Sequence, residues 1–110
     1  DVLTIEKAMG MIADLAGKDD VQSANQLTRW VMTKEEHANK IQHVVTQYFM
    51  TQRLKAPAGD EAAAFAAYTN KLVLLHQMLR TAMLCKQSVD TTHPRALHDL
   101  LHEFKAAYSK

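Results

Sequence analysis

Hydrophobic positions recur every three or four residues through the stretch between residues 60 and 87. One apolar line consists of Phe65, Tyr68, Leu72, Leu75, Leu79 and Ala82. Residues at this spacing share one side of an α-helix, and neither Gly nor Pro interrupts the stretch. A second apolar line runs through Ala67, Leu74 and Met78. The pattern therefore predicts a long central helix over about residues 60–87 that packs against more than one neighbour.

The N-terminal part of the chain has the pattern of a short amphipathic helix. Its apolar positions are Ile5, Ala8, Met9, Ile12, Leu15 and Ala16. Gly17 follows them, at a place where a residue with positive φ commonly ends a helix. Either Asp19 or Asp20 can then cap a second helix. The broad apolar face of this second helix consists of Val21, Ala24, Leu27, Trp30 and Val31.

Residues 21–55 form either one helix or two. Thr33 and Glu36 have the spacing of a capping box, which would start a third helix that ends at about Lys55. However, no Gly or Pro separates the two segments, and an apolar line stays nearly in phase across them through Val31, Ala38, Ile41, Val45 and Tyr48. One continuous helix of about 35 residues is therefore the alternative.

Two proline-containing segments complete the pattern. Residues 56–59 predict a loop because Pro57 biases its predecessor out of the helix, and Asp60 can cap the helix that follows. Pro94 fits the first position of a last helix with Thr92 or His93 as its cap. We therefore expect an all-α fold, a compact bundle of four or five helices, formed by a single domain over residues 1–110.

Charge and composition exclude several classes of function. The 13 basic and 12 acidic residues nearly cancel and alternate in sign, whereas a nucleic-acid-binding protein is normally more basic. No apolar run approaches the roughly 20 residues of a membrane span. We expect a soluble protein without a membrane or nucleic-acid partner, and the single Cys85 is compatible with the reducing cytoplasm. Because the first residue is Asp1, not Met, a processed product or an excised domain is expected.

Neither a catalytic nor a cofactor-binding motif can be recognised. The sequence contains no Ser-His-Asp grouping, no Gly-rich phosphate loop and no Cys-x-x-Cys-His motif for haem attachment. Cys85 lies in the apolar part of the long helix, where a thiol is more often a buried hydrophobe than a nucleophile. We therefore expect no enzymatic activity and no cofactor.

Methionine and aromatic side chains gather in the middle of the chain. They are Trp30, Met32, Tyr48, Phe49 and Met50, and they cannot all face one narrow core stripe. Flexible Met side chains recur on surfaces that accept an apolar helix of another chain. This favours a protein–protein interaction module, an adaptor or a chaperone-like or regulatory bundle. Its partner would be another protein or a second copy of the chain.

Two histidines suggest a different function. His98 and His102 are four residues apart on the last predicted helix, a spacing that can bring two imidazoles to one metal ion. A further ligand, Glu103 or His93, would have to complete the site. The alternative function is therefore a metal-binding bundle, or a haem-binding bundle in which Met9 or Met11 pairs with His102.

Overall fold

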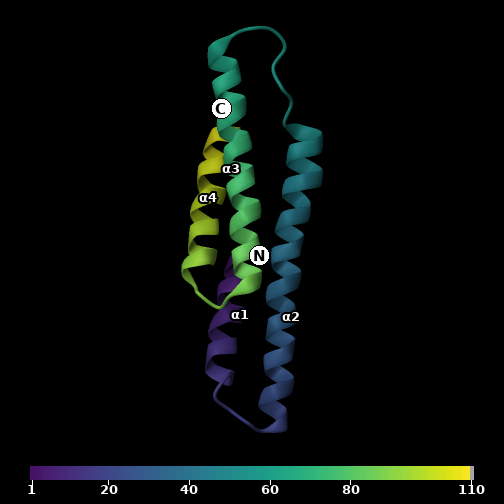
Figure 1. Ribbon diagram of the computed structural model, residues 1–110, viewed down its shortest axis with the longest axis vertical. Coiled ribbons are helices and arrows are strands. Elements are labelled where there is room, and N and C mark those ends of the chain that lie inside the picture. Colours follow the sequence, from purple (N-terminus) through teal and green to yellow (C-terminus); the bar gives the residue numbers. More distant parts are fainter. Residues whose placement is uncertain (110) are drawn as a thin grey trace.

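The computed structural model describes residues 1–109 as four α-helices and one π-helical segment. The helices are α1 (Val2–Leu15), α2 (Val21–His43), α3 (Ala62–Gln87) and α4 (Thr92–Tyr108), and the π-helical segment η1 (Val44–Arg53) continues α2. No strand occurs in these residues, so the predicted all-α bundle is confirmed. The molecule is long and narrow, 63 × 21 × 19 Å (Figure 1).

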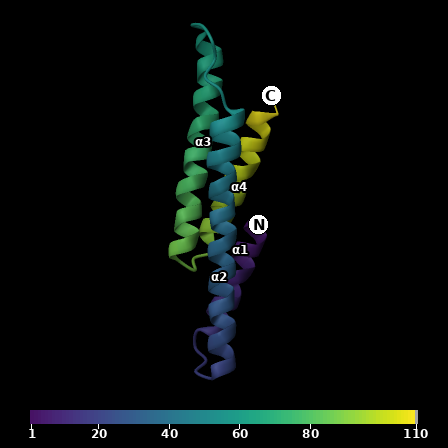
Figure 2. The same cartoon turned by 90° about the vertical axis from the view of Figure 1, so that its right-hand side faces the viewer.

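Two long antiparallel rods determine this shape. One rod is α2 with η1, and the other is α3 (Figures 1 and 2). The shorter α1 packs against α2, and α4 packs against α3. The N-terminal ends of α1 and α4 meet near the middle of the bundle, where the two helices contact each other. All four helices thus contribute to the central part of the molecule, while α1 with α2 and the start of α3 extend beyond it.

The core forms where these helices meet, and α3 supplies its largest share. The buried side chains of the core are Val2, Ile5, Met9, Ala38, Ile41, Val45, Leu74, Leu75, Met78, Ala82, Cys85, Leu97 and Phe104. Leu75 is fully buried, as a central helix requires. Phe65, at the start of the predicted apolar line, is 61% exposed because the first turns of α3 extend past the end of α4. The line is therefore buried only in its second half.

Helix α2 runs without a break through Thr33. Asp20 occupies the N-cap position, and its Oδ2 accepts a hydrogen bond of 3.0 Å from the backbone N–H of Ser23, as predicted for one of the two aspartates. The Thr33 hydroxyl donates to the carbonyl of Arg29, one turn back, instead of capping a new helix. The prediction of a break at Thr33 is wrong, and the continuous helix is confirmed.

The last turns of this rod are not α-helical, in contrast to the prediction. The backbone N–H of Leu54 donates to the carbonyl of Phe49 over 2.7 Å, a bond that spans five residues. The spacing of the apolar side chains gives the physical reason, since Val45, Phe49 and Leu54 are four and five residues apart. The wider turn of the π-helix keeps them on the side of the core, against which Phe49 and Leu54 pack.

Three smaller predictions are corrected, on the end of α1 and on the caps of α3 and α4. Among residues 1–109 the positive φ occurs at Gly59 (98°) and not at Gly17; α1 ends at Leu15, and a turn closed by a 3.1 Å hydrogen bond from the backbone N–H of Lys18 to the carbonyl of Leu15 follows it. The loop before α3 lies where predicted, but Glu61 occupies the N-cap position of α3 and makes no side-chain cap bond.

Helix α4 begins at Thr92, with Thr91 at its N-cap position. The carboxylate of Asp90 accepts a 2.9 Å hydrogen bond from the backbone N–H of Thr92, so neither Thr92 nor His93 acts as the cap.

Within the described part of the chain, no helix has the length and hydrophobicity needed to cross a bilayer.

Candidate functional site

Helix α4 carries the two histidines singled out by the sequence. It begins at Thr92, so His98 and His102 lie in its second and third turns, and both side chains are exposed. Their ring centroids are 4.5 Å apart, with an angle of 69° between the ring planes. The structure therefore brings the predicted pair together.

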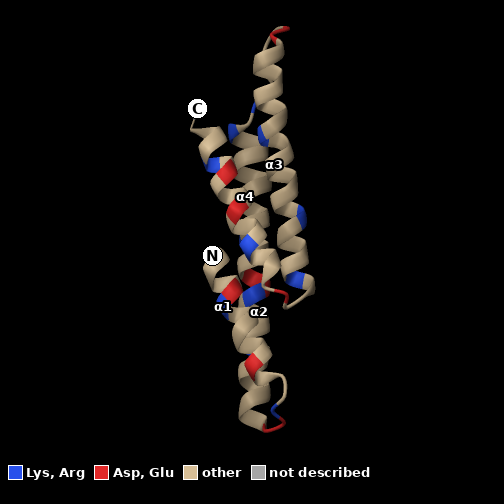
Figure 3. Ribbon diagram, turned by 90° about the vertical axis from the view of Figure 1, so that its left-hand side faces the viewer, with Lys and Arg blue, Asp and Glu red and all other residues tan. Residues whose placement is uncertain are grey.

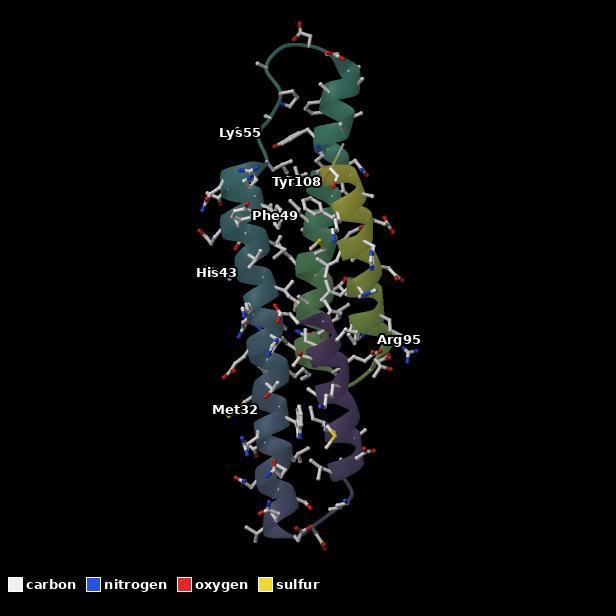
Figure 4. The ribbon with its side chains drawn as sticks, turned by 180° about the vertical axis from the view of Figure 1, so that it is seen from behind. Met32, His43, Phe49, Lys55, Arg95 and Tyr108 are labelled. Atoms are coloured by element: carbon white, nitrogen blue, oxygen red, sulfur yellow. The ribbon has the colours of Figure 1, made fainter. Side chains whose placement is uncertain are left out.

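A shallow cavity of about 470 Å³ lies beside His98, where α1 meets α4. The carboxylate of Glu6 on α1 accepts a 2.9 Å hydrogen bond from Nε of Arg95 on α4. Arg95 projects from the lower end of α4 in Figure 4. Because the Glu6 carboxylate is already paired with a guanidinium, its role here is to hold the two helices together.

No third protein ligand joins the pair. In residues 1–109, no group of three or more His, Cys, Asp or Glu side chains is placed to hold a metal ion. Glu103 and His93, the predicted additional ligands, thus do not complete a three-ligand site.

The predicted haem site is wrong for a related reason, because Met9 is buried in the core whereas His102 is exposed to solvent. An axial haem ligand in a bundle must face the interior.

Cys85 is a core side chain. It is fully buried on α3, and this burial raises the pKa of its thiol to about 11, although the nearby Lys34 charge acts in the opposite direction. At neutral pH the thiol is therefore protonated, whereas metal binding and nucleophilic attack both require the thiolate. Cys85, the single cysteine of the sequence, packs as a small hydrophobe, as expected.

The residues predicted to form one partner-binding face are distributed over different surroundings. Phe49 and Met50 pack against the core, while Met32 is 55% and Tyr48 is 44% exposed. Met32 points away from the bundle in Figure 4. Trp30 is half-buried and lies 18 positions from Tyr48, which at about 1.5 Å per residue is roughly 27 Å along the rod. The five side chains do not form one surface.

An aromatic cluster that sequence reasoning missed explains the position of Phe49. Its ring centroid lies 4.9 Å from that of Phe104 and 5.5 Å from that of Tyr108, both in edge-to-face arrangements. Figure 4 shows Phe49 and Tyr108 in the space between η1 and α4. The Tyr108 hydroxyl accepts a 2.8 Å hydrogen bond from Nε of Arg53. In the sequence, the only sign of this cluster is the i, i+4 spacing of Phe104 and Tyr108 on α4. Phe49 joins η1 to α4 by packing against both rings.

Comparison with known proteins identifies what the motifs did not. The family model for nickel-containing superoxide dismutase matches residues 1–110, the full length of the chain. No curated protein and no solved structure matches the chain significantly.

The match corrects two predictions from the sequence. The interpretation as an adaptor, chaperone-like or regulatory interaction module is wrong, because the matching family consists of metal-containing enzymes. The expectation of no enzymatic activity is wrong for the same reason. Both predictions depended on the absence of a recognisable motif, and apolar periodicity reports how a bundle packs without reporting its chemistry.

The donor groups of the described residues do not make a complete nickel centre. Imidazole nitrogen suits Ni²⁺, and a catalytic metal is typically held by at least three protein ligands. The described residues contribute the two imidazoles of α4, and the Cys85 thiol is buried and protonated. Nickel thus does not fit any ligand set within residues 1–109 of one chain.

Proposed function

Because the chain belongs to the nickel-containing superoxide dismutase family, we propose that this protein removes superoxide by dismutation. In that reaction two superoxide anions and two protons give one dioxygen and one hydrogen peroxide. One superoxide loses the electron that the other gains. The observation that carries the proposal is the family match, which extends over all 110 residues.

The helical bundle is the scaffold of this activity in the proposal. Its core is assembled from all four helices, and Lys34 links α2 to the C-terminal end of α3 through two hydrogen bonds to backbone carbonyls. A rigid element is what an enzyme requires to hold a metal centre in a fixed geometry. Residues 1–109 of one chain contain no set of three side chains placed to hold a metal ion. We therefore infer that metal ligands from outside these residues complete the nickel centre.

Removal and return of the metal test the proposed activity. The protein is purified from its natural source, stripped with a chelator, and reloaded separately with Ni²⁺ or Zn²⁺. We expect the decay of superoxide to be fast in the native protein, to slow to the uncatalysed rate after stripping, and to recover with Ni²⁺ alone. Recovery with Zn²⁺, or native protein that does not accelerate the decay, would contradict the proposal.

Self-association is part of the same proposal. Val44 and Tyr48, both more than 40% exposed, lie four residues apart on η1. Beside them is an open, mainly apolar groove of about 310 Å³, lined among others by Val45, Phe49 and Leu101. Exposed apolar patches of this kind mark contact surfaces, and a second copy of the chain can bury them.

A further inference from the structure

We propose that His98 and His102 bind one divalent transition-metal ion at the surface of α4, with Cu²⁺ preferred over Ni²⁺ and Zn²⁺. We place this site apart from the nickel centre of the family, because its two protein ligands are fewer than the three that typically hold a catalytic metal. The proposal stands on the geometry of the pair and is independent of the proposed dismutase activity.

The distance between the two rings fits a single shared ion. An imidazole nitrogen binds such a metal at about 2.0–2.1 Å and lies about 1.1 Å from its own ring centroid, so each centroid would be about 3.2 Å from the ion. If the two metal–nitrogen bonds meet at about 90°, the two ring centroids are about 4.5 Å apart. The observed separation is 4.5 Å. The separation of the centroids therefore matches that of two neighbouring imidazole ligands of one metal.

The rings are also free to bind. Among residues 1–109, no hydrogen bond to a protein group engages His98 or His102, so metal binding has no hydrogen bond to break and changes only the contact between the two rings. Both side chains are exposed, and water can occupy the remaining coordination positions.

Charge contributes little to the site. Asp99 and Glu103 follow the two histidines directly, while Arg95 and Lys105 lie three residues from them on the same helix. Figure 3 shows acidic and basic residues interspersed along α4. Arg95 is already paired with Glu6, and water screens these exposed charges, so the affinity comes mainly from the two coordinate bonds. The choice of metal then follows the general order of divalent ions at nitrogen ligands, in which Cu²⁺ binds most tightly.

Titration with Cu²⁺ alone tests the proposal. Metal-free protein is followed by isothermal titration calorimetry and by electron paramagnetic resonance, which counts the nitrogens bound to copper. We expect one copper ion with two imidazole nitrogens. His98→Ala and His102→Ala should each weaken this binding by about 100-fold, because the second imidazole binds as an intramolecular partner of the first. Each variant should also lose one coupled nitrogen.

Two other histidines provide matched controls. His76 is exposed on α3 and has no histidine one turn away, so His76→Ala should leave the copper affinity unchanged. His37 Nδ1 lies 3.1 Å from Asp1 Oδ1, so these two side chains are another place where copper could bind. His37→Ala should nevertheless leave copper binding at His98 and His102 unchanged. Circular dichroism verifies that all variants remain helical, which their exposed or half-buried positions predict.

Three results would overturn the proposal. The first is an unchanged copper affinity in both α4 variants, and the second is an equal loss in His76→Ala or His37→Ala. The third is a loss of nickel and of dismutase activity in His98→Ala protein purified from the natural source, which would make the pair part of the nickel centre. Failure of the dismutase assay in the unmodified protein would contradict the proposed function and leave the copper result standing.

Discussion

At the scale of single residues, Lys34 shows how a polar side chain is satisfied inside the bundle. It is 5% exposed on α2, and its ammonium group donates hydrogen bonds of 2.8 Å to the carbonyl of Lys86 and 2.9 Å to the carbonyl of Ser88. These carbonyls lie at the C-terminal end of α3, where helix carbonyls lack partners within the helix. Lys34 thus joins the two rods and satisfies the end of α3.

We expect Lys34→Met to destabilise the protein. The substitution keeps most of the apolar stem but leaves two carbonyls without their charged donor, which should lower the free energy of unfolding by about 2–3 kcal/mol. Urea denaturation followed by circular dichroism measures the change. Lys40→Met, at an exposed position of the same helix, is the matched control and should unfold like the wild type. Equal stability of Lys34→Met and wild type would contradict the assigned role.

The Cys85 thiol should react only when the protein unfolds. Its raised pKa, about 11, means that the thiolate is scarce at pH 8 in the folded state, and burial blocks access of the reagent. We expect a disulfide reagent such as Ellman's reagent to label the native protein far more slowly than the urea-unfolded protein. Labelling at the same rate in both states would show that Cys85 is accessible.

Sequence reasoning at this scale found local features and missed distant ones. The Asp20 cap and the His98–His102 pair involve residues three and four positions apart, so the sequence identifies the histidine pair and limits the cap to Asp19 or Asp20. The partners of Lys34 are 52 and 54 residues away, and backbone carbonyls have no sequence signature. Phe49 was predicted to lie on the surface, because the sequence does not show which distant residues will cover an aromatic side chain after folding.

At the scale of elements, the positions of the long helices and of the loop between them were easier to predict than the helix caps or the π-helical segment. The loop around Pro57 and the long α3 follow directly from backbone chemistry and periodicity. The α-to-π transition at Val44 depends on how Val45, Phe49 and Leu54 meet α3 and α4, which is a tertiary requirement. Propensity within one segment does not contain that information.

The N-terminal cap of α2 should give a pH-dependent contribution to stability. Hydrogen bonds from the side chain and the backbone N–H of Ser23 lower the pKa of the Asp20 carboxyl below its ordinary range. A lowered pKa in the folded state means that the stabilisation is present above the ordinary carboxyl pKa and is lost as the pH falls through the folded value.

We therefore expect Asp20→Ala to lower the melting temperature at about pH 7 and to have a smaller effect in acid, below the lowered pKa of the wild-type carboxyl. Thermal unfolding of both proteins at the two pH values measures the difference. Asp19→Ala, at the exposed neighbouring position, is the control. A deficit of the same size at both pH values would exclude a cap that depends on the ionised carboxylate.

At the scale of the whole molecule, the fold could be predicted and the chemistry could not. Four helices with short loops follow from apolar periodicity. The enzymatic class became clear only from the family match, because no set of three metal ligands lies within residues 1–109. The error was to treat a missing motif as evidence for a binding module.

Self-association is a prediction about the whole molecule. Native mass spectrometry of the purified protein should give a multiple of the mass of its denatured single chain. Val44→Glu introduces a charge into the exposed patch on η1 and should shift the protein toward the monomer, whereas Val21→Glu, at an exposed site on the far end of α2, should not. A monomeric wild type at micromolar concentration would contradict self-association.

The central claim is that this bundle serves a nickel-dependent superoxide dismutase. Its most direct test is the rate of superoxide decay measured against bound nickel, in preparations from the natural source that contain graded amounts of the metal. The account predicts a rate that rises in proportion to nickel content and falls to the uncatalysed rate when nickel is absent. A rate that does not depend on nickel, or nickel-containing protein without activity, would contradict it.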